Sequence, residues 1–208
     1  MHPEWLSNAY IVWDEGSRRA FFVDSGAPLA PLLDVVEAEG LTVERLLTTH
    51  THHDHVAGDD ELARRFGISP GREGPGVQVI ETPGHADDHV TFVVDGFCFS
   101  GDLLFRDAVG GGDAATIRES VLKLLELPDE TRVLPGHTEE TTIGREREEN
   151  PFVRYWLGNA PPIDELCRVG GEEATLVVWS PDYDGKGKAL VRFADGSERI
   201  VGGSRVER

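Results

Sequence analysis

The chain has 208 residues, of which 39% are apolar, and this suits one substantial domain with room for a small additional unit. Acidic residues outnumber basic ones 38 to 20, which gives a formal net charge of −18. Proteins that bind nucleic acids gain much of their affinity from Lys and Arg side chains at phosphates, so this charge argues against a nucleic-acid partner.

Membrane insertion and secretion are not expected either. No apolar run approaches the roughly 18–20 residues of a membrane-spanning helix, and the first residues, "MHPEWLSNAY", have neither the basic start nor the apolar stretch of a secretion signal. The two cysteines, Cys98 and Cys167, are too few for a disulfide framework. We therefore expect a cytoplasmic protein without a membrane partner, present as a monomer or a homodimer.

The first part of the chain alternates short strands with short helices. Apolar and β-branched runs predict the strands, and the i, i+4, i+7, i+8 spacing of Ile117, Val121, Leu124 and Leu125 predicts an amphipathic helix. The expected elements are a hairpin at 8–26, a helix at 32–40, a strand at 43–50, a helix at 59–67, a strand at 77–85, a hairpin at 89–102 turning at Asp95-Gly96, a helix at 115–128, a strand at 131–137 and a helix at 144–159.

The last part of the chain contains only strand-like runs. They follow Pro161-Pro162 and are separated by short turns that pair aspartate with glycine. The sequence therefore predicts two units, a mixed domain at residues 1–163 and a small β appendage at 172–208. The three expected strands of the appendage are 174–180, 188–194 and 197–203.

Side chains that can ligate metals cluster at the ends of four predicted strands. The stretch "THTHHDH" at residues 49–55 holds four of the eight histidines around one aspartate. "TPGH", "FSGD" and "LPGH" each place one more such side chain after an apolar run, where loops present residues from a rigid frame. The candidate ligands are His50, His52, Asp54, His55, His85, Asp102 and His137.

The spacing within the first stretch separates two positions. Side chains alternate along an extended segment, so His50 and His52 can chelate one cation, while Asp54 and His55, at the turn into the next helix, can face a second. Imidazole and carboxylate suit zinc, iron and manganese. Seven ligands are too many for one tetrahedral ion but fit two divalent ions about 3.5–4 Å apart. We expect two ions, with zinc as the first choice and iron or manganese as alternatives.

The four motifs, in this order, resemble those of the metallo-β-lactamase-fold hydrolases. Within that superfamily, "TTHTHHDHVAGDDEL", "ETPGHADDHVTFVV", "FSGDLLF" and "LPGHTEETTIGREREENPF" are similar to the glyoxalase II group, the hydroxyacylglutathione hydrolases and their shorter homologues. The resemblance implies an α/β fold, a four-layer αβ/βα sandwich with the site at one edge between two sheets. Residues 1–163 would form this catalytic domain, and the small C-terminal β appendage would follow it.

The resemblance also implies a role for each candidate ligand. His50, His52 and His85 would hold one metal, Asp54, His55 and His137 the other, and Asp102 would bridge the two. Asp24, after an early strand, matches an aspartate that supports the histidine loop in this family.

Several residues near the motifs are expected to have other roles. His53 and His89 are predicted to be a surface or a satisfied core side chain rather than ligands, and His2 is a terminal residue. Arg106 and Asp107, close to the loop "VGGGD", are predicted to contact the substrate.

The expected reaction is hydrolysis of a small-molecule thioester, or of a related ester or lactone. Two cations lower the pKa of a bridging water towards 7, and the hydroxide attacks a polarised carbonyl group. Asp54 is then a metal ligand and also the catalytic residue that orients the nucleophile. A thiolate leaves with little protonation, which suits a site without a dedicated acid.

The main alternative is a persulfide dioxygenase with a single iron. Such enzymes also resemble glyoxalase II, and "FRDAVGGGD" is similar to loops of both groups. A nuclease is disfavoured by the acidity of the chain, and a non-catalytic module by the presence of all seven ligands. The thiol carrier stays open, because residues 172–208 do not match the helical domain that binds glutathione in full-length glyoxalase II. The segment between His55 and His85 is short, and the sequence does not determine how this affects the shape of the pocket.

Overall fold

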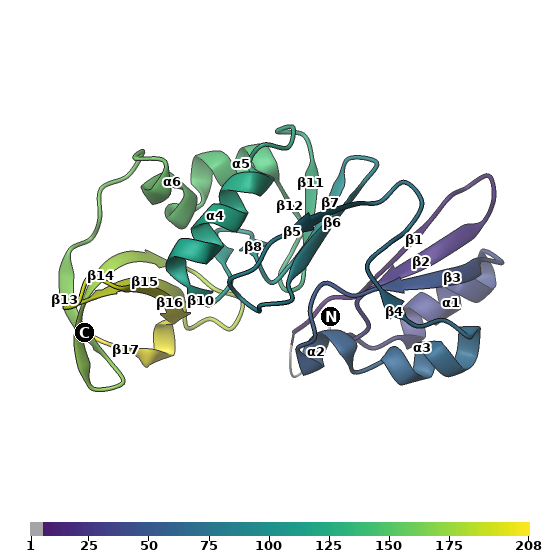
Figure 1. Cartoon of the computed structure of the whole chain (residues 1–208), viewed down its shortest axis with the longest axis horizontal. Coiled ribbons are helices and arrows are strands. Elements are labelled where there is room, and N and C mark those ends of the chain that lie inside the picture. The colour runs from purple at the N-terminus through teal and green to yellow at the C-terminus, as the bar shows by residue number, and fades with distance from the viewer. Residues whose placement is uncertain (1–5) are drawn as a thin grey trace.

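The computed structural model of the chain describes residues 6–208, so His2 lies outside the described residues. Its N-terminal part builds a four-stranded sheet with helices on the outer face (Figure 1). The predicted hairpin is confirmed as β1 and β2, and β3 and β4 continue the sheet in parallel. The bounds are β1 (Tyr10–Trp13), β2 (Arg19–Val23), α1 (Ala30–Ala38), β3 (Thr42–Leu47), α2 (His53–Val56), α3 (Asp59–Phe66) and β4 (Pro70–Gly71).

A second sheet has five strands in the order β12-β11-β7-β6-β5. β6 and β7 form the predicted hairpin at Asp95-Gly96, and β11 pairs with β7 in parallel. A small separate hairpin, β8 and β9, follows β7. The bounds are β5 (Gln78–Glu81), β6 (Val90–Val94), β7 (Phe97–Gly101), β8 (Leu104–Phe105), β9 (Ala108–Val109), β11 (Arg132–Pro135) and β12 (Thr141–Thr142).

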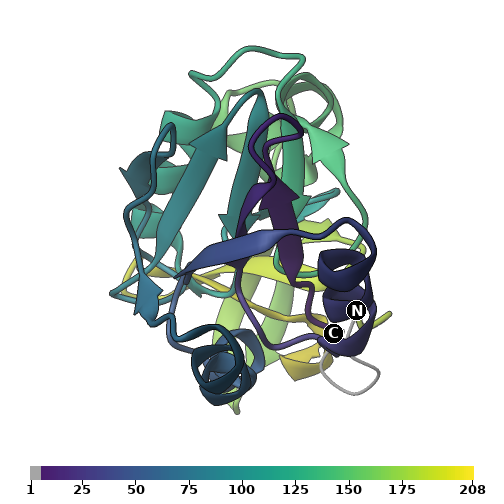
Figure 2. The ribbon, with the colours of Figure 1, turned by 90° about the vertical axis from the view of Figure 1, so that its right-hand side faces the viewer.

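The two sheets and their helices make four layers. One buried apolar cluster, which includes Leu47 and Phe92, joins the facing sides of the two sheets. A second, with Leu33 and Leu62, joins α1 and α3 to the first sheet. A third, with Ile117, joins the second sheet to the helices on its far side. In Figure 1 the four-stranded sheet lies at the right with α1 and α3 beneath it, the five-stranded sheet lies in the middle, and α4 and α5 lie to its left; the four-stranded sheet is on the near side in Figure 2. The predicted αβ/βα fold is confirmed.

The helices of the second half differ in one respect from the prediction. The single helix expected at 144–159 is two, α5 (Ile143–Glu149) and α6 (Pro151–Trp156), because Pro151 has no backbone N–H and Asn150 adopts an extended conformation. The Asn150 side chain accepts from the first free N–H groups of α6. α4 (Ala114–Leu124) begins at Asp113, whose carboxylate accepts from the backbone N–H of Thr116.

The C-terminal part forms a sheet that packs against α4 and α6 as a fifth layer (Figure 1). It has six strands in the order β10-β16-β15-β14-β13-β17, rather than the three expected. β13 is mostly exposed and the two edge strands have two residues each, so their apolar periodicity is weak. β10 belongs to the first predicted unit and β13 lies between the two, so the division into 1–163 and 172–208 stays a prediction. The bounds are β10 (Gly112–Asp113), β13 (Glu165–Val169), β14 (Glu172–Ser180), β15 (Lys188–Phe193), β16 (Glu198–Gly202), the 3-10 helix η1 (Gly203–Arg205) and β17 (Val206–Glu207).

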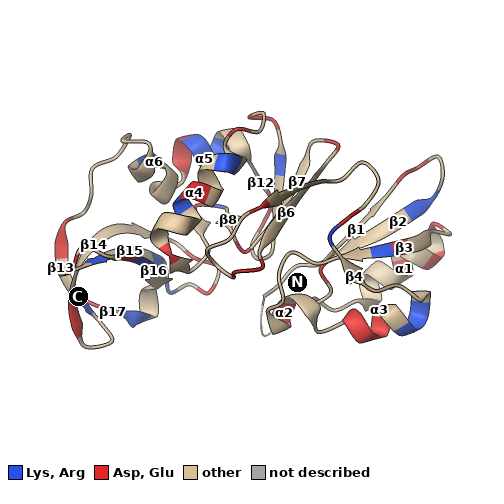
Figure 3. Cartoon of the chain, viewed as in Figure 1, with Lys and Arg blue, Asp and Glu red and all other residues tan. Residues whose placement is uncertain are grey.

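Charged side chains are distributed over the whole molecule. In the view of Figure 3 the basic residues lie on several separate elements, including β2, α3 and α5. Within residues 6–208, no helix is long and apolar enough to cross a membrane.

Candidate metal centre

The structure brings all seven candidate ligands together. Strands β3, β5, β7 and β11 end at the cluster, and α2 with the residue before it supplies the remaining ligands. Their ligand atoms form three overlapping groups, within each of which they lie no more than 4.8 Å apart. The groups are His50, His52 and His85; His50, His55 and Asp102; and Asp54, His55 and His137.

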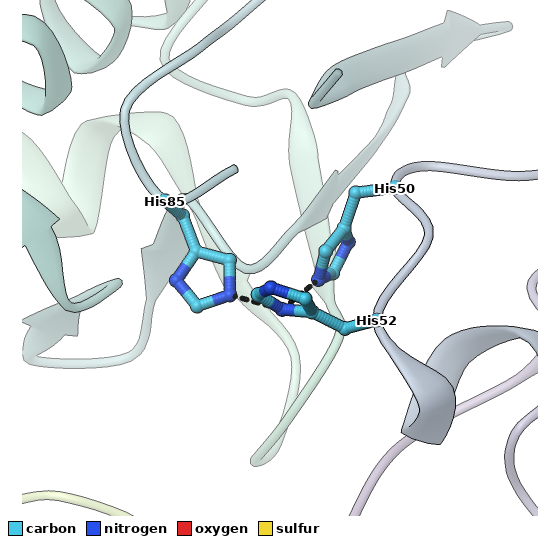
Figure 4. A group of neighbouring side chains, drawn as sticks. All are labelled: His50, His52 and His85. Atoms are coloured by element: carbon cyan, nitrogen blue, oxygen red, sulfur yellow. Dashed lines mark hydrogen bonds between the residues drawn. The ribbon is translucent and has the colours of Figure 1, made fainter. Parts of the chain in front are cut away.

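Three imidazoles converge in the first group (Figure 4). The Nε2 atoms of His50 and His85 lie 3.0 and 2.9 Å from the Nδ1 atom of His52, which is between them. One ring nitrogen carries either a hydrogen or a lone pair, so it cannot complete a hydrogen bond to both neighbours. A cation shared by the three nitrogens would satisfy all of them.

Asp102 joins this group to the second one. Its Oδ2 atom lies 3.4 Å from His85 Nε2 and 3.3 Å from His137 Nε2, and its Oδ1 atom lies 3.2 Å from His55 Nε2. Asp54 approaches the second group through Oδ2, which lies 3.4 Å from His137 Nε2 and 3.8 Å from His55 Nε2. Asp102 thus occupies the position between the two groups that a bridging carboxylate needs.

Four of the histidines are held through the nitrogen that points away from the cluster. In each case Nδ1 has an oxygen partner, which favours the tautomer with its hydrogen on Nδ1 and leaves the Nε2 lone pair for a cation. The pairs are His50 with Thr49 Oγ1 at 3.1 Å, His55 with Asp24 Oδ2 at 2.8 Å, His85 with the Gly111 carbonyl at 3.0 Å and His137 with the Leu6 carbonyl at 3.0 Å.

Two buried polar atoms of the cluster lack a hydrogen-bond partner, His55 Nε2 and Asp102 Oδ1. They face each other at 3.2 Å but without the geometry of a hydrogen bond. Buried polar atoms are nearly always paired, and an unpaired one costs about 1–3 kcal/mol. Imidazole nitrogens and carboxylate oxygens, with these two unpaired atoms among them, fit a divalent cation.

The carboxylates also change the protonation of the second group. Burial opposes a charge on His55, but its contacts with Asp102 and Asp24 outweigh burial and raise its pKa to about 11. The same balance, with Asp102 and Asp54, raises the pKa of His137 to about 9. Burial alone would raise the pKa of Asp102, yet the two histidines hold it well below its usual range. A divalent ion must therefore displace protons from this group, which weakens its binding at low pH.

Asp24 supports the histidine loop, as the resemblance implied. Its Oδ1 atom accepts from the backbone N–H of Thr49 and its Oδ2 atom from the Thr49 hydroxyl, both at 2.8 Å. Oδ2 also lies 2.8 Å from His55 Nδ1. One buried carboxylate therefore fixes both the start of the loop and the orientation of a candidate ligand.

His89 is a satisfied core side chain behind Asp102. Its Nε2 atom accepts a hydrogen bond from the backbone N–H of Asp102 at 3.0 Å, and its Nδ1 atom lies 2.9 Å from Thr82 Oγ1. Burial lowers the pKa of His89 to about 3, so the ring stays neutral and can accept. The sequence carries no signal for its bond to the Asp102 backbone.

His89→Ala is expected to lower the free energy of unfolding by about 1–3 kcal/mol, because the buried N–H of Asp102 loses its acceptor. Bound metal should also fall, because the backbone that carries Asp102 is no longer held. Urea unfolding of the metal-free protein measures the first effect and elemental analysis the second. Values equal to those of an Asp87→Ala control, an exposed position in the same loop, would contradict this role.

The two predicted substrate contacts lie in the turn between β8 and β9. Arg106 is exposed and forms an ion pair with Glu139 at 2.8 Å. The Asp107 carboxylate accepts from Arg145 at 2.8 Å, and its backbone N–H donates to the buried Glu146. Their contact with substrate stays a prediction.

Tyr183 reaches the cluster from the loop between β14 and β15, and the sequence did not indicate it. Its ring stacks on that of His137, with centroids 4.3 Å apart. Burial, together with the negative charges of Asp102 and Asp54, raises its pKa, so the phenol keeps its hydrogen. The exposed His53, by contrast, belongs to none of the ligand groups found among residues 6–208.

Comparison with known proteins agrees with this geometry. The family model described as the metallo-beta-lactamase superfamily matches residues 2–75 and 66–137, a range that spans more than half of the chain and contains all seven candidate ligands. The chain belongs to this superfamily.

Individual proteins are similar to this chain over most of its length. A hydroxyacylglutathione hydrolase of Chromohalobacter salexigens is 28% identical, and the match covers 70% of this chain and 81% of that protein. The structure of TTHA1623 in a di-iron-bound form is 32% identical with a TM-score of 0.65, covering 73% of this chain and 97% of the other. ETHE1 from Myxococcus xanthus is 25% identical with a TM-score of 0.62, covering 76% and 88%. The prediction of a metal-dependent hydrolase of the glyoxalase II-like group is confirmed.

Proposed function

We propose that the chain hydrolyses thioesters of a small thiol, using two divalent ions. The supporting observation is the pair of donor groups with Asp102 between them, in which four histidines direct Nε2 inward. The relatives named hydroxyacylglutathione hydrolases favour a hydroxyacyl thioester of glutathione, or of a thiol of similar size, as the substrate. Zinc is the first choice of metal, with iron or manganese as alternatives, and TTHA1623 is a relative with two irons.

The proposed ligands divide as the donor groups do. His50, His52 and His85 would hold one ion, Asp54, His55 and His137 the other, and Asp102 both. The chemistry that such ions supply when bound is to acidify water and to polarise a carbonyl group, which thioester cleavage at neutral pH requires.

The residues of the chain orient the reaction. The Asp54 side chain is 28% exposed, against 8% for Asp102, so Asp54 is the carboxylate that attacking water can reach. We assign Asp54 the role of orienting that water and accepting its proton. Asp24 and the carbonyl groups of Leu6 and Gly111 keep the imidazoles in place during the reaction. A thiolate can leave without protonation, so the site needs no separate acid.

Persulfide oxidation at a single iron is disfavoured by the second donor group. A one-iron site would leave the inward Nε2 atoms of His55 and His137 without a metal, although Asp24 and Leu6 hold both rings in a ligating orientation. The two reactions also consume different substrates, so a direct comparison separates them.

Metal analysis and a substrate panel test the proposal. The native protein is expected to contain two divalent ions per chain and to release thiol from a hydroxyacyl-glutathione thioester. A chelator should remove the ions and the activity, and zinc should restore both. One iron per chain, with oxygen consumed on glutathione persulfide and no thioester cleavage, would contradict the hydrolase.

The cytoplasmic location, the monomeric or homodimeric state and the lack of a nucleic-acid partner remain predictions. Cell fractionation, light scattering and a nucleic-acid binding assay would test them in turn.

A further inference from the structure

The C-terminal sheet contributes a side chain to the metal centre. Tyr183 lies in the loop between β14 and β15, and its ring is nearly parallel to that of His137, with an interplanar angle of 6° and centroids 4.3 Å apart. The two residues are far apart in the sequence and come from different sheets. A stack this close covers one face of a candidate ligand with an aromatic ring.

The loop that carries Tyr183 is held by an ion pair between Asp182 and Lys188. The Asp182 and Lys188 side chains are 3% and 10% exposed and form an ion pair at 2.9 Å. Asp182 Oδ1 also accepts from the backbone N–H of Tyr183 at 2.9 Å, and Lys188 Nζ lies 5.7 Å from the centre of its ring. A nearly buried ion pair is costly to leave without partners, so the loop is held in one conformation. These contacts hold Tyr183 in its position over His137.

The polar contacts of His137 act at its two ring nitrogens, whereas Tyr183 stacks on a face of the ring. Nδ1 is held by the Leu6 carbonyl, which fixes one point of the ring but not its tilt. The ring of Phe105 meets both aromatic rings edge-on, with centroids 5.9 Å from His137 and 6.0 Å from Tyr183. Tyr183 supplies the flat contact, and Nε2 then faces Asp54 and Asp102.

We propose that Tyr183 is a positioning residue of the metal centre, which holds the imidazole of His137 in the plane needed to bind the ion shared with Asp54 and His55. On this proposal the C-terminal sheet supplies a side chain that the metal centre requires, rather than being only an appendage. This inference rests on the proposed two-ion function, and it concerns only one of the two ions. The partners that orient a metal ligand typically change metal affinity 10–100-fold.

Cobalt titration of the metal-free protein tests the role without any substrate. Tyr183→Ala is expected to weaken one of two Co²⁺ binding steps by about 10-fold and to change the visible absorption of that ion, while the other step keeps its affinity. Tyr183→Phe keeps the stacking ring and should restore both. Thermal melting of the metal-free variants reports whether folding is intact.

Tyr155→Ala is the matched control, because Tyr155 also packs at the C-terminal sheet, where its hydroxyl oxygen accepts a hydrogen bond from Arg192. Unchanged Co²⁺ binding in Tyr183→Ala would overturn the proposal, and so would an equal loss in Tyr183→Phe or in Tyr155→Ala. A protein that binds two Co²⁺ ions but cleaves no thioester would contradict the proposed function instead, and the titration would still decide the role of Tyr183.

Discussion

Asp102→Ala is expected to abolish thioester hydrolysis and to weaken metal binding by more than about 100-fold, because even the outer partners of metal ligands change affinity 10–100-fold. The carboxylate contacts His85 on one side and His55 and His137 on the other, so its loss affects both donor groups. Elemental analysis after gel filtration measures bound metal, and thiol release measures activity.

The same variant should change the metal-free protein in a defined direction. Asp102 helps to raise the pKa of His137 to about 9, so its removal should lower that pKa, with Asp54 retaining part of the effect. Titration followed by NMR would detect the change. His53→Ala removes an exposed imidazole beside the ligands and should leave metal content and turnover near wild type. Near-wild-type metal content and turnover in Asp102→Ala would refute the two-ion centre.

The order of strands and helices was predictable because local signals agree with the tertiary structure. The α3 helix shows this well, with three acidic residues in its first turn, arginines in its last and Gly67 at a φ of 67° as its end. The β6–β7 hairpin was equally clear from its turn at Asp95-Gly96. At Asn150 and Pro151 the helical composition on both sides competes with a helix-breaking pair, and the sequence analysis predicted one helix where the structure has α5 and α6.

Four of the candidate ligands, His50 among them, were predictable because each is the first suitable side chain after a strand. His85, Asp102 and His137 follow β5, β7 and β11, which run in the same direction within one sheet, so their ends lie at the same edge. The division into two donor groups also follows from the spacing of the first stretch, in which alternation places His50 and His52 on one side. The strand pattern of the sequence thus predicted the candidate ligands, but it did not predict the residues that hold them.

Those partners have no periodic signal. Thr49 and His89 hold ligands through single hydrogen bonds whose geometry depends on loop conformation. Tyr183 is in a turn that the sequence indicates only as a connection between strands, and its stack on His137 depends on how the C-terminal sheet packs against α4 and α6. Such contacts depend on the packing of segments that are far apart in the sequence, so no local sequence pattern predicts them.

Gly136→Ala is expected to reduce metal binding about as strongly as the loss of an outer partner of a ligand, 10–100-fold, although it removes no ligand. A Cβ atom at this position would lie 2.3 Å from Asp102 Oδ1 and 2.6 Å from His55 Cε1. The backbone cannot move aside easily, because Gly136 N donates to the Gly101 carbonyl at 2.8 Å and its carbonyl accepts from Asn8 at 2.7 Å. The side chains must therefore shift.

The crowding should also lower the free energy of unfolding by about 1–3 kcal/mol. Gly71→Ala is the matched control, since no atom lies within 4 Å of a Cβ atom there. Calorimetric titration with zinc and urea unfolding of both variants would separate the two effects. If Gly136→Ala binds two ions with wild-type affinity, the positions of Asp102 and His55 tolerate displacement, and the identity of the ligands rather than their spacing determines the affinity of the centre. A loss confined to Gly136→Ala would mean that the glycine of "LPGH" is present to leave room for the Asp102 carboxylate.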